Sequence, residues 1–344
     1  MQDERVEEPA TPVAGGAAMT AVLQERYGPE PERVLRVAQL PRPVAGDGEV
    51  LVRVSATSVD RGTWHVMAGL PYPVRLAGFG LRRPTGPNPG RNLAGTVVAV
   101  GAGVDEFAPG DEVFGVGRGT FAEYALARPG KLAPAPARLS PAEAAATPVS
   151  GLTALQAVRD HGRVQAGERV LVIGASGGVG TFAVQLAKAA GAEVTATCRT
   201  DKLAAVRTLG ADDVLDHAEQ DVTAGGHRYD VVLDIGGNRR LTGLRRVLTS
   251  RGRLVIVGGE NGGRWLGGTD RQLRAQALSP FVAHQLGTFV ASENAADLRA
   301  LAGLVEAGQV TPVLDRTYPL ADTAAAIRRL LDGDGVGKVV VSVP

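Results

Sequence analysis

The 344-residue sequence predicts an α/β fold with two domains, a small β-barrel-like domain and a doubly wound parallel sheet. Short strand-like segments broken by Gly and Pro fill residues 19–150. Apolar strands then alternate with amphipathic helices over residues 151–309, which indicates a parallel sheet covered on both faces. Residues 310–344 are expected to rejoin the first domain. The acidic and then Pro- and Ala-rich residues 1–18 predict a disordered tail.

In the first domain, each expected strand is a short apolar or alternating run that ends at Gly or Pro. The runs are, in order, TAVLQERYG, RVLRVAQL, EVLVRVSATSVD, GRNLAGTVVAVGAGV, GDEVFGVG and GTFAEYALA. Strands this short with Gly and Pro between them predict a small β-barrel-like domain.

The composition becomes helical over residues 139–162, a stretch that spans the boundary between the two expected domains. A strand at RVLVIG is followed by a helix that runs to Ala190, and AEVTATC by a helix near 202–209. Next come DDVLDH, YDVVLDIGG, a helix near 239–249 and GRLVIVGG. The chain closes with the helix LADTAAAIRRLLDGD and the strand GKVVVSVP.

The charge balance excludes several functional classes. The 37 basic and 36 acidic residues nearly cancel, so no electrostatic attraction to nucleic acid or to an anionic membrane is expected.

No apolar run is long enough to cross a bilayer, and the N-terminus lacks the features of a signal peptide. A single cysteine excludes an internal disulfide framework and a multi-cysteine zinc lobe. A soluble cytoplasmic protein is expected.

A nucleotide-binding turn follows the strand at RVLVIG. Ala175, Gly177 and Gly180 occupy the three positions of a G-x-G-x-x-G pattern, and the intervening residues are Ser176, Gly178 and Val179. Glycine at the second position lets the backbone approach a pyrophosphate, and glycine at the third lets helix and strand pack closely. The unpaired N–H groups at the start of the helix suit the phosphates.

The end of the next strand predicts which nucleotide binds. A carboxylate there would bind the ribose 2′-hydroxyl of NAD, but Cys198, Arg199 and Thr200 stand there instead, with Lys202 close behind. Two cations and a hydroxyl suit the 2′-phosphate of NADPH. The alternative is that Arg199 and Lys202 are solvated residues at a helix start. Cys198 is interpreted as a buried strand end without an activating base.

Together these segments resemble the medium-chain dehydrogenase/reductase superfamily, in particular its zinc-independent quinone oxidoreductase (ζ-crystallin-like) branch. The resemblance runs from Met19 to Pro344 and rests on six segments, GPNPGRNLAGTVVAVGAGVDEFAPGDEVFG, GLTALQAV, IGASGGVGTFAVQLAKAAGA, LGADDVLDH, YDVVLDIGG and GKVVV. It implies a GroES-like catalytic domain, a Rossmann cofactor domain and usually a homodimer joined through the cofactor domains.

The resemblance also implies that no metal binds. The positions that hold catalytic zinc in metal-dependent members are Asp60, Arg91 and Val149 here, and these three cannot form an open tetrahedral site. Without a Lewis acid on a carbonyl oxygen, the remaining acceptors are conjugated ones, a quinone or an α,β-unsaturated carbonyl. Hydrogen-bond donors then stabilise the developing oxyanion.

The catalytic candidates come from the segment SVDRGTWHVMAGLPY. Asp60 replaces an asparagine that is common in the quinone reductases, and His65 and Tyr72 match positions near their nicotinamide cleft. We expect His65 and Tyr72 to donate or orient a proton. The alternatives are that Asp60 caps a turn and that His65 is a surface side chain.

On the cofactor side, the resemblance implies further contacts. Thr153 matches a threonine that contacts nicotinamide, and Val257, Gly258 and Gly259 match a strand end beside the nicotinamide amide. His217 takes the place of a tyrosine near the adenosine phosphate. The Gly/Pro-rich segment 74–88 is expected to line or cover a substrate cleft, where Arg82 and Arg83 could meet an acidic substrate or remain solvated.

Three functions follow as hypotheses. The first is an NADPH-dependent, zinc-independent reductase of quinones or α,β-unsaturated carbonyls. The second is a dedicated biosynthetic enoyl reductase with a single physiological enone. The third is a crystallin-like protein that binds the nucleotide with little turnover, which the loss of the family asparagine at Asp60 favours.

Overall fold

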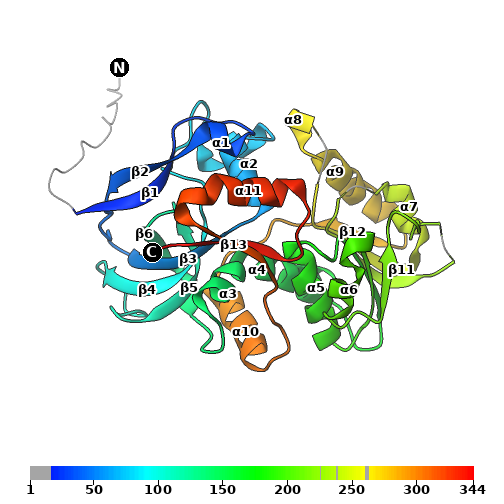
Figure 1. Ribbon diagram of the computed structural model, residues 1–344. Coiled ribbons are helices and arrows are strands. Elements are labelled where there is room, and N and C mark those ends of the chain that lie inside the picture. The colour runs from blue at the N-terminus through cyan, green and yellow to red at the C-terminus, as the bar shows by residue number, and fades with distance from the viewer. Residues whose placement is uncertain (1–16, 225, 238, 260–262) are drawn as a thin grey trace, which may run out of the picture.

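A computed structural model describes residues 17–224, 226–237, 239–259 and 263–344. Most of the predicted tail, residues 1–16, lies outside the described residues, and Ala18 already begins the first strand. The described chain forms two six-stranded sheets and a two-stranded hairpin. Figure 1 shows the two sheets side by side, with the C-terminal segment in red running between them. The predicted fold class is confirmed.

The first sheet is barrel-like. In sheet order, its strands are β13 (Leu314–Pro319), β14 (Lys338–Ser342), β3 (Val50–Val59), β4 (Asn92–Val100), β5 (Glu112–Arg118) and β6 (Tyr124–Pro134). Strand β3 also pairs with β6, so the sheet curls back on itself. Val50, Val52 and Val54 alternate along β3 and point into one core, which is the period of two that a strand requires.

Smaller elements complete this domain. The hairpin pairs β1 (Ala18–Gln24) with β2 (Leu35–Pro41), and α1 (Pro31–Val34) lies between them. The other helical elements are α2 (Arg61–Ala68), the irregular turn η1 (Arg75–Phe79), α3 (Pro141–Ala146), η5 (Leu320–Asp322) and α11 (Thr323–Asp332). The chain end returns to the first domain because β14 pairs antiparallel with β3.

The second sheet is parallel and has the strand order β12-β11-β10-β7-β8-β9. The strands are β7 (Arg169–Ile173), β8 (Glu193–Cys198), β9 (Asp213–Asp216), β10 (Tyr229–Asp234), β11 (Leu248–Ile256) and β12 (Gln285–Thr288). This is the doubly wound order 3-2-1-4-5-6 read from the other edge. Val170 and Val172 enter the core on one face, and Leu171 and Ile173 the core on the other.

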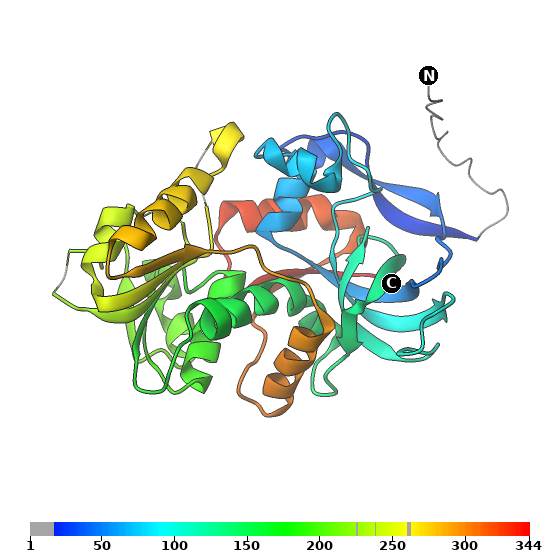
Figure 2. The same ribbon diagram turned by 180° about the vertical axis from the view of Figure 1, so that it is seen from behind.

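Helices cover both faces of the parallel sheet, as Figure 2 shows from behind. The helical elements of this domain are α4 (Pro148–Gln156), η2 (Ala157–His161), α5 (Gly178–Ala189), η3 (Thr200–Lys202), α6 (Leu203–Arg207), α7 (Leu241–Arg246), α8 (Gly263–Leu266), α9 (Thr269–Leu278), η4 (Ser279–Phe281) and α10 (Ala295–Glu306). The short helix α8 is exposed and projects away from the sheet. Helix α10 packs against β6 as well as α4, so it also contacts the barrel domain.

Two predicted helices differ from the observed ones. The helical stretch over residues 139–162 is divided into α3, α4 and η2, because Pro148 lacks an N–H group and starts a new helix. The helix expected near 239–249 ends at Arg246, because Leu248 already pairs with Tyr229 as the first residue of β11. The first difference has a local cause in Pro148, and the second arises from strand pairing with a distant segment.

Replacement of Gly180 tests the packing at the start of α5. A Cβ atom at this position would lie 2.2 Å from the carbonyl oxygen of Gly174, so Gly180→Ala forces the backbone apart. We expect a loss of about 2 kcal/mol or more in the free energy of unfolding, measured by denaturant titration. Gly303→Ala is the matched control, because a Cβ atom on that α10 glycine meets nothing within 4 Å. It should be neutral or stabilising by up to about 1 kcal/mol. Equal stabilities of the two variants would contradict this packing.

Candidate functional site

A cleft of about 420 Å³ lies where the two domains meet. Its walls come from the turn before α5, the ends of β8 and β10, the end of β3 and the loop between α11 and β14. Nine of the predicted site residues line it, namely Asp60, Ser176, Gly177, Gly178, Val179, Cys198, Arg199, Lys202 and His217. The cleft lies at the carboxyl ends of the parallel strands, which is where this fold binds ligands.

Glycines make the turn before α5 fit its surroundings closely. Gly177 precedes the helix, and Gly180 passes so near the Gly174 carbonyl that no side chain fits. A Cβ atom on Gly178 would lie 2.7 Å from the Lys338 side chain. The Gly337 amide donates a hydrogen bond to the Ser176 carbonyl at 2.9 Å, so the C-terminal segment lies directly against the turn. Ala175 is fully buried beneath it.

Cationic side chains gather at the far end of β8. Arg199 donates to the carboxylates of Asp201 and Asp334, each at 3.1 Å, and these partners raise the pKa of the guanidinium. Lys202 is only 5% exposed, and burial lowers the pKa of its ammonium group. Its Nζ donates to the carbonyl oxygens of Gly333 and Gly335 at 2.6 and 2.7 Å. The loop after α11 therefore holds both cations.

The neighbouring residues tie β8 to β9. The Thr200 hydroxyl donates to the Asp216 carboxylate, and the His217 amide donates to the Cys198 carbonyl at 3.0 Å. Thr200 itself does not line the cleft, whereas His217 does. Burial raises the pKa of the Cys198 thiol to about 11, with a further contribution from the Asp216 carboxylate. This agrees with the interpretation of Cys198 as an inert strand end.

Asp60 caps α2 and lies in the cleft wall. Its Oδ1 accepts the Thr63 amide at 2.8 Å, and its Oδ2 accepts the Asn92 side-chain amide at 2.8 Å. Burial acts to raise the pKa of this carboxyl, but the Lys338 ammonium and the two amide donors outweigh burial and leave the pKa below its usual range. Asp60 is thus an ionised, fully engaged helix cap as well as a cleft residue.

Lys338 is a buried cation that the sequence interpretation did not include among the site residues. It is 2% exposed, it begins β14, and its Nζ donates to the Val59 carbonyl at 2.9 Å. Burial lowers its pKa, and the nearby Asp60 carboxylate opposes this effect. The sequence signal for this residue is the lone lysine that precedes the apolar run of the closing GKVVV segment.

The other predicted catalytic residues lie elsewhere. His65 makes a hydrogen bond through Nδ1 to the Leu70 carbonyl at 2.7 Å, and its ring packs edge-on against Trp64. The Tyr72 ring packs edge-on against Trp265 of the cofactor domain. Neither residue is part of the cleft lining. Their proposed role in proton transfer stays a prediction.

The residues predicted beside the nicotinamide also fall outside this lining. The Thr153 hydroxyl donates to the Val149 carbonyl within its own helix at 2.7 Å. Val257, Gly258 and Gly259 follow β11, and a Cβ atom on Gly258 would lie 2.1 Å from the Ile235 carbonyl oxygen. Gly258 therefore allows two strand ends to approach closely.

Comparisons with known proteins agree with this architecture. The model of the "Alcohol dehydrogenase GroES-like domain" family matches residues 46–137, and that of the "Zinc-binding dehydrogenase" family matches residues 209–341. The chain is 32% identical to a chloroplast envelope quinone oxidoreductase homolog from Arabidopsis thaliana, over 95% of this chain and 99% of the relative. The chain belongs to the medium-chain dehydrogenase/reductase superfamily.

Two further relatives of this superfamily are informative. The mitochondrial NAD(P)H oxidoreductase RTN4IP1 of Homo sapiens is 31% identical over 94% of this chain and 89% of its own length. The crystal structure of the CurK enoyl reductase has a TM-score of 0.77 and 25% identity, and covers 95% of this chain and 99% of its own. Our chain is thus an oxidoreductase with a nicotinamide cofactor and a small-molecule substrate.

The residues at the zinc positions of the superfamily do not fit a metal ion. Asp60 caps a helix, Arg91 forms an ion pair with Glu293, and Val149 offers no side-chain ligand. No group of three or more His, Cys, Asp or Glu side chains that could hold a metal occurs among the residues that the structure describes. Zinc therefore has no part in the proposed chemistry, although the family model that matches residues 209–341 is named for zinc binding.

Location and assembly stay predictions. The described helices include none with the length and apolar character that a bilayer span requires. The Arabidopsis and human relatives have chloroplast and mitochondrial names, so they lend no support to the expected cytoplasmic location. The expected homodimer is likewise untested.

Alkylation of the single cysteine tests its environment. A thiol pKa of about 11 in place of 9 lowers the thiolate fraction about 100-fold near pH 8. Iodoacetamide should therefore label Cys198 at least about 100-fold more slowly in the folded protein than in denaturant, as followed by mass spectrometry. Labelling of the folded protein at the rate of the unfolded chain would contradict the buried, inert strand end.

Proposed function

We propose that this protein is an NADPH-dependent, zinc-independent oxidoreductase that transfers hydride to a quinone or an α,β-unsaturated carbonyl. The observation that carries the proposal is the convergence of the glycine turn and two cations in one interdomain cleft. Ser176, Gly177 and Gly178 suit the pyrophosphate, and Arg199 and Lys202 suit a 2′-phosphate. The bound nicotinamide supplies the hydride.

The residues of the cleft provide the walls of the site and the hydrogen-bond donors for the reaction. The buried Asp60 and Lys338 form one wall of the cleft, and the turn before α5 forms another. Hydride addition to a conjugated acceptor leaves an oxyanion, which hydrogen-bond donors in a partly desolvated site can stabilise. The Lys338 ammonium has further protons beyond the one it donates to Val59, so it is a donor at the cleft wall.

The carboxylates around Arg199 bear on nucleotide choice. Asp334 and Asp201 both form ion pairs with the Arg199 guanidinium, so a 2′-phosphate bound there would share the guanidinium with them or displace them. A phosphate carries more charge than one carboxylate and accepts through three oxygens, which favours the exchange. We therefore infer that NADPH is preferred, at a lower affinity than an unopposed arginine would give.

Two variants at this end of the cleft should change NADPH affinity in opposite directions. Arg199→Asp should weaken NADPH binding by about 2 kcal/mol or more, because an attraction becomes a repulsion. Asp334→Asn should tighten NADPH binding about fivefold, because a competing carboxylate is removed while its size is kept. NADH binding, measured in parallel by fluorescence titration, should change little in either variant.

The control for these variants is Asp332→Asn, which removes the same charge from an exposed residue at the end of α11 that does not line the cleft. It should bind NADPH as the unmodified protein does. If Arg199→Asp left NADPH affinity unchanged, the 2′-phosphate would have to bind elsewhere. A fall in NADPH affinity in Asp334→Asn would show that Asp334 orients Arg199 and does not compete with the phosphate.

Turnover tests the reaction itself. We expect consumption of NADPH, followed by its absorbance, with 1,4-benzoquinone and with a simple enone such as 4-phenylbut-3-en-2-one. Consumption with NADH should be slower. Tight NADPH binding without turnover of any acceptor in a panel of quinones, enones and enoyl thioesters would instead support the crystallin-like alternative.

A dedicated enoyl reductase is the second candidate. The similarity to the CurK enoyl reductase favours this function. The same cleft residues would serve an enoyl substrate. Turnover confined to enoyl thioesters in the acceptor panel would support this function over a general quinone reductase.

A further inference from the structure

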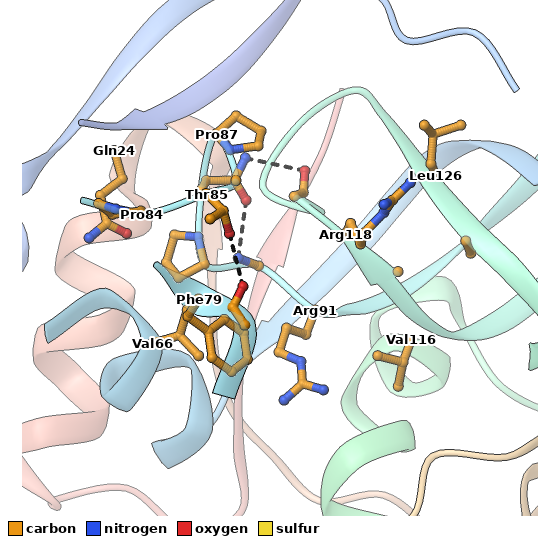
Figure 3. Close-up of a pocket in the computed structure, with 18 of the residues that line it drawn as sticks. Gln24, Val66, Phe79, Pro84, Thr85, Pro87, Arg91, Val116, Arg118 and Leu126 are labelled. Carbon is orange, nitrogen blue, oxygen red and sulfur yellow. Dashed lines mark hydrogen bonds between the residues drawn. The ribbon is translucent and has the colours of Figure 1, made fainter. Parts of the chain in front are cut away.

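A second cavity, of about 390 Å³, lies in the barrel domain. Figure 3 shows its walls, which come from residues 78–79 and 84–91, from β5 and β6 and from the side chain of Val66 on α2. Glu293 of the cofactor domain completes the lining. The volume suits a small organic molecule. The segment 74–88, predicted to line or cover a substrate cleft, thus contributes directly to this cavity.

The second cavity adjoins the cofactor cleft. Arg91 lines the cavity, and the next residue, Asn92, donates its side-chain amide to Asp60 in the wall of the cleft. Burial acts to raise the pKa of the Asp60 carboxyl, and Arg91 helps Lys338 and the hydrogen bonds from Thr63 and Asn92 to lower it. A molecule in the second cavity would therefore lie beside the cofactor cleft.

Hydrogen bonds hold the cavity wall in place before any ligand binds. The side-chain amide of Asn88 donates to the carbonyls of Val22, Gly119 and Phe121 at 3.1, 3.2 and 3.3 Å. Its Oδ1 accepts the amides of Gly90 and Phe121 at 3.1 and 3.2 Å, and Figure 3 shows part of this network. A buried residue with five such contacts fixes the segment 86–90 against β1 and the loop after β5.

The lining is apolar over much of its area. Val66, Phe79, Val116 and Leu126 provide aliphatic and aromatic surface, together with prolines of the segment 84–89. Figure 3 shows Arg91 between Phe79 and Val116. Such surface suits the carbon skeleton of a conjugated acceptor.

The charged residues of the lining are mostly positive. Four cationic side chains and one carboxylate belong to its described part, and they are Arg91, Arg118, Arg128, Lys131 and Glu293. Glu293 pairs with both Arg91 and Lys131, so one carboxylate serves two cations.

The two remaining cations differ in their partners. Arg118 pairs with Glu49, which lies outside the lining, and its side chain is 71% exposed. Arg128 has no hydrogen-bond or ion-pair partner among the residues that the structure describes, and its side chain is available to a ligand. An apolar cavity with an excess of cations suits a molecule with an apolar body and an anionic group.

We propose that this cavity binds the acceptor substrate and that the acceptor carries an anionic group, a carboxylate or a phosphate, which Arg128 and Arg118 receive. The proposal rests on the proposed function, because the acceptor is the conjugated compound that takes the hydride. Arg82 and Arg83, considered from the sequence as contacts to an acidic substrate, are exposed and do not line the cavity. The anion site is therefore at the ends of β5 and β6, not in the loop 81–83.

Binding of two saturated ketones tests the proposal without turnover. The probes are 4-(4-carboxyphenyl)butan-2-one and its uncharged parent, 4-phenylbutan-2-one, titrated by calorimetry into the protein saturated with NADP⁺. We expect the carboxylate to bind about tenfold more tightly than the parent, with an advantage that falls as salt is added. Equal affinities at low salt would overturn the proposal.

Paired variants locate the anion site. In Arg128→Glu the ratio of the two affinities should fall about tenfold, because a cation becomes a repelling carboxylate. Arg53→Glu is the matched control, with the same charge change on an exposed residue of β3 outside the lining, and it should keep the original ratio. An equal fall in both variants would show a general electrostatic effect and contradict a site at Arg128.

Kinetics separate the two sources of negative charge. Crotonyl-CoA carries phosphates, its N-acetylcysteamine thioester carries none, and 4-(4-carboxyphenyl)but-3-en-2-one carries a carboxylate. If only the carboxylated enone has a higher kcat/KM than the uncharged N-acetylcysteamine thioester, the anionic group of the substrate is a carboxylate. If only crotonyl-CoA has a higher kcat/KM than that thioester, the anionic group is a phosphate. If none of the three is reduced but the carboxylated ketone still binds at Arg128, the anion site stands and the proposed hydride transfer fails.

Discussion

The buried ammonium group of Lys338 is the interaction on which the two-domain arrangement depends. It lies between the end of β3, where it donates to Val59, and the glycine turn before α5, where Gly178 leaves room for its side chain. The adjacent Gly337 pairs with Gly177, so the last strand of the barrel is joined to the nucleotide turn. Asp60 is buried nearby, and the charge of Lys338 helps to keep its carboxyl ionised beside the amide donors of Thr63 and Asn92.

This arrangement gives the loop after α11 two roles. It connects α11 to β14, and its carbonyls and Asp334 hold Lys202 and Arg199 at the end of β8. These contacts within the chain restrain both cationic side chains, which reduces the entropy that they would lose when a phosphate binds. The same contacts lower the net charge that a phosphate would meet. The loop therefore positions the two cations for a phosphate, while its Asp334 carboxylate competes with that phosphate for Arg199.

The sequence predicted the fold and part of the cleft lining, because these parts depend on local sequence patterns. The turn from Ala175 to Gly180, together with Arg199, Lys202 and His217, lies within or just after strand–helix units whose geometry is set by short-range patterns. Lys338, Asp334 and Glu293 were missed because their roles arise from contacts with residues more than 100 positions away. His65 and Tyr72 could be placed near the cleft by resemblance, but the sequence carried no information on which way their side chains point.

Affinity of the unmodified protein for two nucleotide fragments tests the central claim most directly. The fragments 2′,5′-ADP and 5′-AMP differ only in the 2′-phosphate, so their ratio of affinities measures what Arg199 and Lys202 contribute. The account predicts that 2′,5′-ADP binds at least about tenfold more tightly, with a difference that shrinks as salt is added. Equal binding of the two fragments would contradict a 2′-phosphate site at the end of β8 and, with it, the preference for NADPH.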